Sequence, residues 1–342
     1  MNDNAVGYIF VEDDSAYNYM YDAIFLDASR KRNFCTIVEK PFDSKFNNIL
    51  RKRRVQRYIG GFLSFYYTNQ YLLQERIDTI SRQYQEVIVL FTNSSFIRSK
   101  YPIDLLKKYK KQYKNLKYVL LYVDIVNHPV SEYANFLRGY GIFDLVYTVD
   151  KTDAVKYGFE YTFTPYSIDE KKIINAYKNG VYFCGATKGR ESEIVSFYRR
   201  CSIEKIETSM DIICTDENIK SLISPSDKEV RLRKKDDYLL YPEVLSRSLG
   251  YSCILEIVQK NQTALTLRAY EAVCYNRKLL TNNKTILEFP YYNKKYMQYF
   301  ESIDDINWNW IKSTEHVDYG YKGDFSPILL LDRINKELKI RQ

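Results

Sequence analysis

Apolar runs of strand length alternate with segments of helical character in the first half of the chain. The runs predict strands at Gly7–Val11, Phe34–Val38, Val87–Phe91, Tyr118–Val123 and Leu145–Thr148. The lysine-rich segment Leu105–Leu116 has the spacing of a surface helix. Strands that alternate with helices are typical of βαβ units, so this half predicts a parallel sheet.

The pattern pauses at Tyr161–Asp169, and we place a domain boundary there. Beyond it we expect strands at Val181–Cys184, Ile212–Cys214, Ser252–Ile257 and Lys278–Thr281, and helices at Glu191–Arg200, Leu267–Cys274 and Pro327–Ile340. The expectation is therefore an α/β protein of two doubly wound, Rossmann-like domains, residues 1–165 and 166–342, facing each other across a cleft. Whether the last helix packs back on the N-terminal domain stays open.

Composition narrows the class of protein. Hydrophobic residues make up 45% and charged residues 27% of the 342 positions, which is a globular composition. No apolar run reaches eighteen residues, and the N-terminus lacks the features of a signal peptide. The six cysteines are scattered without a Cys-x-x-Cys pair, which favours a reducing, cytoplasmic compartment over a disulfide framework or a zinc site.

The net charge of +8 favours anionic partners such as nucleotides, pyrophosphates or anionic lipid. A basic cluster, Arg51, Lys52, Arg53 and Arg54, stands among aromatic residues, which suits the surface of an anionic membrane and a peripheral location at its inner face. The alternative is a solvated helix face. Nucleic acid is a less favoured partner, because the basic residues form no recognisable binding module.

The first segment with candidate chemistry runs from a predicted strand through Gly185, Lys188 and Arg190 into a predicted helix. Such a turn directs backbone N–H groups and the positive end of a helix at an anion, and the two cations suit phosphate. The spacing matches neither a Walker loop nor Gly-x-Gly-x-x-Gly. An ordinary strand-to-helix turn with surface charges is the alternative.

The second segment carries Thr266, Arg268 and Glu271. Thr266 is a candidate N-cap for the predicted helix, and positions 268 and 271 share one face of it. Arg268 near a helix start suits a diphosphate, and Glu271 one turn later could accept bonds from two ribose hydroxyls. A surface ion pair between the two residues is the alternative.

The segments Ser248–Ile257, Gln262–Ala272 and Lys278–Asn283 together resemble the donor half of bacterial GT-B glycosyltransferases, and are most similar to those of capsule and lipopolysaccharide gene clusters. Asp144–Thr148 and Phe183–Gly185 also resemble that group. The resemblance covers about residues 140–285. It implies a GT-B fold and an enzyme that moves a sugar from a nucleotide diphosphate sugar to a glycan or lipid-linked saccharide in surface polysaccharide synthesis.

Site roles follow from the same resemblance. It implies that Lys188, Arg190 and Arg268 face the diphosphate, that Thr266 assists them, and that Glu271 holds the ribose. The nucleotide-sugar enters as a substrate, with UDP favoured over GDP, and no separate cofactor is expected. With these cations on the leaving diphosphate we expect no metal requirement.

One departure from the family pattern concerns stereochemistry. Many retaining members carry two glutamates eight residues apart, whereas the position eight before Glu271 is Thr263, and Glu256 is too far back to replace it. Inversion or retention of the anomeric configuration therefore stays open.

The candidate acceptor-side bases lie in the first half of the chain. Asp13 and Asp124 follow predicted strands, and His128 follows four residues later, so each could take a proton from an attacking hydroxyl. The alternatives are a helix cap for Asp13 and an ion pair for Asp124. His316 is expected at the surface. A basic, tyrosine-rich nucleic-acid-binding protein and a non-catalytic GT-B-like protein are the competing functions.

Overall fold

The computed structural model describes residues 5–13, 18–39, 72–99, 101, 103–123, 141–174, 176–214, 229–234, 237, 239–260 and 262–340. The chain forms two compact units. The first contains Met1–Ser167 together with Phe325–Gln342, and the second contains Ile168–Asp324. The division falls two residues beyond the boundary we placed at 165, and the C-terminal segment belongs with the first unit.

The first unit is built around a six-stranded parallel sheet of order β2-β1-β3-β4-β5-β6. Its elements are β1 (Val6–Asp13), α1 (Asn18–Ile24), α2 (Leu26–Lys31), β2 (Phe34–Glu39), α5 (Leu72–Ile80), β3 (Glu86–Thr92), α6 (Asn93–Ser99), α7 (Ile103–Gln112), β4 (Leu116–Tyr122), β5 (Leu145–Thr148), α9 (Lys151–Tyr157), β6 (Glu160–Tyr161) and α15 (Pro327–Glu337). Because β2 and β3 flank β1, the chain reverses its winding at β1 and the sheet is doubly wound.

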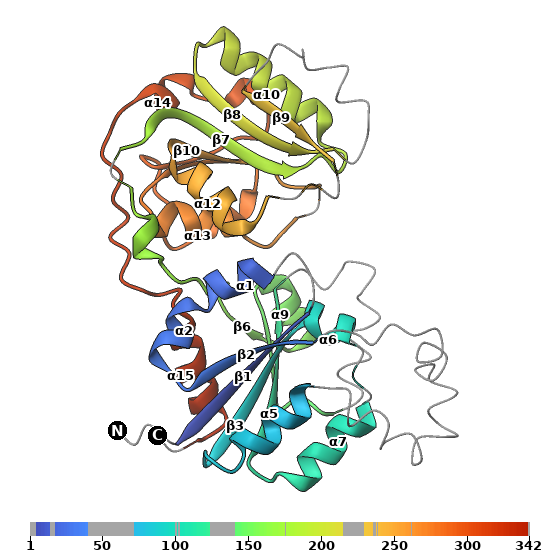
Figure 1. Ribbon diagram of the computed structural model, residues 1–342. Helices are drawn as coiled ribbons and strands as arrows, with labels where there is room; N and C mark the ends of the chain where they lie inside the picture. Colours follow the sequence, from blue (N-terminus) through green and yellow to red (C-terminus); the bar gives the residue numbers. More distant parts are fainter. Residues whose placement is uncertain are drawn as a thin grey trace. The chain divides into compact units, whose positions relative to one another are not determined.

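Alternation along β1 divides the core of this unit into two layers. Ile9 and Val11 belong to a cluster that includes the buried residues of α5 and α7. Phe10 points the other way and packs on the rings of Tyr21 and Phe25. Figure 1 shows α5 and α7 on one side of this sheet and α2 and α15 on the other. Both faces are covered, which explains why the strands are continuous apolar runs.

The second unit has the same plan. Its parallel sheet has the order β12-β11-β10-β7-β8-β9. Its elements are η1 (Glu170–Lys172), β7 (Lys178–Ala186), α10 (Glu191–Ile203), β8 (Glu207–Ile213), β9 (Val230–Arg233), α12 (Tyr241–Leu249), β10 (Tyr251–Glu256), α13 (Leu267–Cys274), β11 (Lys278–Thr281), η2 (Lys284–Glu288), β12 (Met297–Tyr299), η3 (Ile303–Asp305) and α14 (Trp308–Lys312). The winding reverses between the neighbouring strands β7 and β10.

Helices cover both faces of the second sheet as well. Val181 and Phe183 pack with the buried residues of α10 and α14, while α12 and α13 lie on the opposite face (Figure 1). Helix α10 buries positions Ile194, Phe197 and Cys201, which recur at helical spacing. The expectation of two doubly wound α/β units is confirmed.

All nine predicted strands are present, and the bounds of β5 and β11 match the prediction. Sequence analysis missed β6, β9 and β12, which are short strands at sheet edges. In the part of the chain that is described, no helix combines the length and apolar character needed to cross a membrane. All six cysteines are described, and each is a free thiol.

Candidate functional site

The carboxyl ends of β7 and β10 define the candidate site in the second unit. These two strands are neighbours, and the winding of the sheet reverses between them. In doubly wound sheets, ligands bind beyond the carboxyl ends of the strands at such a switch point. Strand β7 leads into Lys188 and Arg190, and β10 leads towards Thr266, Arg268 and Glu271. The topology therefore brings the two predicted segments to one edge of the sheet.

The turn between β7 and α10 differs from the prediction at its start. We expected the strand to end at Cys184 and the turn to begin at Gly185. Instead β7 continues through Ala186, and Gly185 pairs with Ile212 of β8 inside the sheet. The runs of apolar residues end at Cys184, but the hydrogen-bond ladder does not.

The turn itself is left-handed at two successive residues. Lys188 has a φ of 44° and Gly189 a φ of 80°, so a glycine suits the second position. Lys188 is exposed. The N–H of Gly189 donates to a carboxylate oxygen of Glu191 at 3.3 Å. Part of the anion-binding capacity of this turn is thus used by an acidic residue in the first turn of α10.

Arg190 folds back onto the ends of the strands. Its guanidinium donates to the carbonyls of Ala186, Thr187 and Ile257, the last of which follows β10. Burial and the nearby charge of Arg268 lower the pKa of Arg190. Two guanidinium groups therefore lie close together at the switch point. Like charges held together in a partly dry site favour an anionic ligand.

Thr266 caps α13, as predicted. Its hydroxyl oxygen accepts from the N–H of Arg268 at 3.2 Å, which satisfies one of the free donors at the helix start. The guanidinium of Arg268 donates to the carbonyl of Cys184 in β7 at 2.8 Å. This bond ties the first turn of α13 to the neighbouring strand and fixes the guanidinium near Arg190.

Glu271 is fully buried one turn further along α13. One carboxylate oxygen accepts from the hydroxyl of Tyr241 at 2.9 Å. The other, Oε2, has no hydrogen-bond partner among the described residues. Burial acts to lower the pKa of Arg268, but Glu271, Cys184, Tyr241 and Glu256 together outweigh it and the pKa is raised. A buried carboxylate oxygen without a donor is costly, so this atom is suited to a ligand that brings hydroxyl groups.

Sequence analysis missed the role of Glu256. It ends β10, and its two carboxylate oxygens accept from the hydroxyls of Thr266 and Thr281. Burial raises the pKa of this carboxyl. Glu256 is far from Glu271 in sequence, yet the charge of Arg268 lowers the pKa of Glu256 and that of Glu271 raises it. The sequence feature that could have pointed to Glu256 is its position at the carboxyl end of a predicted strand, because these ends come together along one side of a parallel sheet.

No protein-family model and no curated protein sequence matches the chain. Among solved structures, an alpha-glucosyltransferase in complex with UDP-glucose and DNA containing an abasic site has a TM-score of 0.55 at 12% identity, covering 97% of this chain and 100% of that one. A glycosyltransferase from Rickettsia africae ESF-5 has a TM-score of 0.52 at 11% identity, covering 99% and 100%. The chain has the GT-B fold.

The GT-B fold does not fix the reaction. A protein from Listeria monocytogenes that is described as a UDP-N-acetylglucosamine 2-epimerase has a TM-score of 0.50 at 10% identity, covering 99% of this chain and 98% of that one. Since one fold hosts several chemistries, function has to be argued from the site.

The first unit of the GT-B fold holds the predicted acceptor-side residues. Asp13 is the last residue of β1, at the carboxyl edge where that sheet reverses its winding. Asp124, His128 and the basic cluster at 51–54 lie outside the described residues. His316, in the second unit, is exposed. Among the described residues, no group of three His, Cys, Asp or Glu side chains is arranged to hold a metal ion.

Proposed function

We propose that the protein is a glycosyltransferase that binds a nucleotide diphosphate sugar at the carboxyl edge of β7 and β10 and transfers the sugar to a hydroxyl acceptor. The observation that carries this proposal is the meeting of Arg190, Arg268 and Glu271 at the switch point of the second sheet. The glycosyltransferases with a similar fold support it.

Each residue has a role in this proposal. Arg268, with Lys188 and Arg190, faces the diphosphate and stabilises the charge that develops as the sugar leaves. Thr266 orients the first turn of α13 through its cap. Glu271 accepts from ribose hydroxyls through Oε2, the oxygen that lacks a described partner. Guanidinium groups supply the positive charge, so we propose that transfer needs no divalent metal and continues in EDTA.

The proposed nucleotide is uridine diphosphate, which one similar structure holds as UDP-glucose. The proposed acceptor is a glycan or a lipid-linked saccharide, with Asp13, Asp124 or His128 as the base. The same similar structure also holds DNA, so DNA is the second acceptor to test. A peripheral location on an anionic membrane, through residues 51–54, belongs to the same proposal.

The test begins with binding of UDP by calorimetry to the wild type, Arg268→Gln and Glu271→Gln. We expect both substitutions to weaken binding, each by about 10- to 100-fold, since each removes a charge-assisted hydrogen bond. Arg277→Gln is the matched control. Arg277 is another buried arginine of the second unit that donates to backbone carbonyls, those of Leu249 and Ile174 among them, away from the switch point. Unchanged UDP affinity in Arg268→Gln and Glu271→Gln would refute the site.

A panel of UDP- and GDP-sugars then tests the reaction. Release of UDP that depends on a saccharide acceptor supports the transferase. Conversion of a UDP-sugar into its epimer without an acceptor would instead indicate an epimerase. Binding of UDP with no turnover of any donor would indicate a non-catalytic protein.

A further inference from the structure

A second polar pocket lies in the second unit, at the amino ends of its strands. A pocket of about 770 Å³ is lined by Ala176, Tyr177, Lys178, Ser209, Arg231, Ser246, Arg247, Gly250 and Tyr251. Lys178 and Tyr251 are the first residues of β7 and β10, so the pocket opens at the amino ends of these strands. The other end of β7 is eight residues away, about 26 Å at the usual rise per residue. The pocket is therefore distinct from the proposed nucleotide site.

The lining is cationic. Three of the nine lining residues carry a positive charge and none carries a negative one. Lys178 and Arg247 have acidic partners, Glu207 and Glu243, but these are surface pairs that water and salt screen. Arg231 and Arg247 share one acidic partner, the fully buried Asp211, and Arg231 also donates to the hydroxyl of Ser209 at 2.7 Å.

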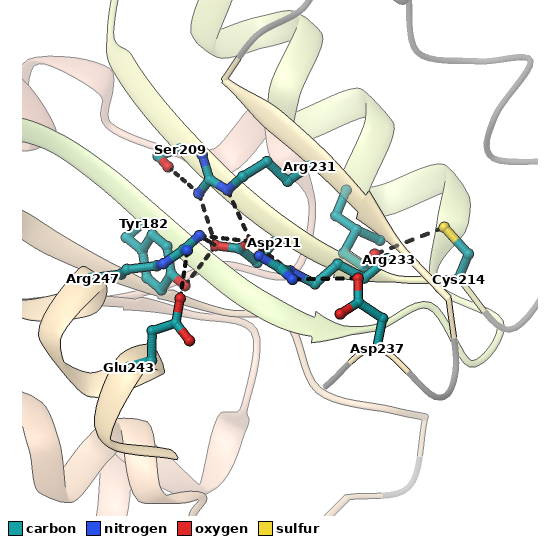
Figure 2. Close-up of polar contacts among 10 residues, drawn as sticks. Tyr182, Ser209, Asp211, Cys214, Arg231, Arg233, Asp237, Glu243 and Arg247 are labelled. Atoms are coloured by element: carbon teal, nitrogen blue, oxygen red, sulfur yellow. Dashed lines mark hydrogen bonds and ion pairs between the residues drawn. The ribbon is translucent and has the colours of Figure 1, made fainter. Parts of the chain in front are cut away.

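Asp211 holds these arginines in fixed orientations, as Figure 2 shows. Its carboxylate accepts from Arg231 Nε and Nη2 at 2.9 and 2.8 Å, and from Arg247 Nη1 at 3.1 Å. Arg233 and Tyr182 also donate to it. Nη1 of Arg231 has no described hydrogen-bond partner. One buried carboxylate thus orients more guanidinium groups than are needed to neutralise it, and orientation before binding lowers the entropy cost of holding a ligand.

Two tyrosines, two serines, Ala176 and Gly250 complete the lining. The ring of Tyr251 stacks on Tyr182 at 6.0 Å, and the guanidinium of Arg277 lies over the ring of Tyr177 at 4.1 Å, so both rings are held in place. Tyr177 nevertheless keeps 39% exposure. The volume is within the usual range for small-molecule sites and far exceeds a single phosphate ion. Aromatic rings beside cations suit an anionic group carried on a sugar-sized body.

We propose that this pocket is a second ligand site, specific for a sugar phosphate, in which Arg231 and Arg247 bind the phosphate and Tyr177 and Tyr251 contact the sugar. A guanidinium carries five N–H donors, so Arg231 keeps Nη1 for a phosphate oxygen while Nε and Nη2 bond Asp211. Lys178 contributes to the positive field at the rim of the pocket. The site is independent of the nucleotide site, and the proposal does not depend on the transferase assignment.

The test uses the full chain and α-glucose 1-phosphate as the probe, measured by calorimetry, with inorganic phosphate and glucose as separate arms. The key variant is Arg231→Gln and its matched control is Arg233→Gln. Both arginines stand on β9 and donate Nε to Asp211 at 2.9 Å, but only Arg231 lines the pocket. We expect Arg231→Gln to weaken binding about 10- to 100-fold and Arg233→Gln to leave it nearly unchanged.

Lys178→Gln provides a second variant, because its side chain is 61% exposed and pairs with Glu207 at the surface. It should weaken binding by a few-fold, and more at low salt. Equal affinity of wild type, Arg231→Gln and Lys178→Gln for glucose 1-phosphate would overturn the proposal. Glucose 1-phosphate that binds no more tightly than inorganic phosphate would also overturn it, since the sugar then makes no contact.

The two sites can be separated in one experiment. Arg231→Gln should weaken binding of glucose 1-phosphate but not of UDP, whereas Arg268→Gln should weaken binding of UDP but not of glucose 1-phosphate. If Arg268→Gln weakens binding of glucose 1-phosphate and Arg231→Gln does not, the pocket is not the sugar phosphate site, whatever the result for UDP.

Discussion

The buried carboxylate of Asp211 should be the most sensitive polar position in the second unit. Three arginines, from β9 and α12, and Tyr182 direct their donors at its two oxygens. In Asp211→Asn the shape is kept, but the negative charge is lost and an amide group faces guanidinium donors. Arg231, Arg233 and Arg247 then lie close together without their shared counter-ion.

The expected cost follows from this geometry. Removing one partner from a buried ion pair destabilises a protein by about 3–5 kcal/mol, because the other charge is left uncompensated. With about 2–4 °C per kcal/mol for a unit of this size, the melting temperature of the second unit should fall by roughly 6–20 °C. The matched control is Asp237→Asn. Asp237 also pairs with Arg233, at 3.5 Å, but it is 64% exposed, so its loss should cost within about 0.5 kcal/mol.

Tryptophan fluorescence during urea unfolding is the appropriate assay. The chain has two tryptophans, Trp308 and Trp310, and both belong to the second unit, so the signal reports that unit. Trp308 packs against Phe197 in the core, so unfolding changes its surroundings. Equal midpoints for Asp211→Asn and Asp237→Asn would refute the claim that Asp211 balances the arginine cluster.

Asp211→Asn should also change how the stability of the second unit depends on pH. Burial would raise the pKa of the Asp211 carboxyl, but hydrogen bonds from Arg231, Arg233 and Tyr182 outweigh it and hold the pKa well below its usual range. The stabilisation is therefore complete above about pH 4, the ordinary value for an aspartate, and declines as the pH falls towards the lower folded-state value. Asp211→Asn should lack this decline.

Three further predictions concern other positions. Thr266→Val should lower the stability of the second unit by about 0.5–2 kcal/mol through loss of the helix cap, and Thr266→Ser should restore most of it, both measured by urea unfolding; equal losses in the two variants would contradict the cap. Because burial raises the pKa of Glu256, the unfolded chain loses this proton first, and wild-type stability should fall as the pH rises from about 4.3 towards the raised value. Glu256→Gln should abolish that fall, and an identical pH profile would contradict the assignment. Leu331→Ala in α15 should cost about 2–5 kcal/mol in the first unit only, so circular dichroism should detect an earlier transition while the tryptophan transition stays in place; a shift of the tryptophan transition alone would be the contrary result.

The resemblance in sequence located the segments of the candidate site but not their contacts. The sequence suggested the role of Arg190 but not that its guanidinium bonds carbonyls at the ends of β7 and β10. Glu256 was set aside because of its distance along the chain, yet it bonds the cap residue Thr266. Both differences arise because a hydrogen-bond partner is chosen by distance in space, which sequence spacing does not give.

The sequence by itself determined the class of fold. The run Val87–Phe91 is buried throughout, so its apolar character is continuous and its bounds can be read to within one residue of β3. The same holds for α13, whose cap and apolar face are local features. Strand bounds, helix caps and apolar helix faces depend on residues within a few positions of one another, so they can be predicted from the sequence.

Only the tertiary structure decided which strands stand side by side. The edge strand β9 has the half-exposed sequence Val-Arg-Leu-Arg and becomes a strand by pairing with β8. That pairing, together with α12, brings Arg231 and Arg247 to Asp211 from 20 and 36 residues away. Strand order and register set such meetings, and they depend on the burial of the whole sheet, which no local pattern of residues specifies.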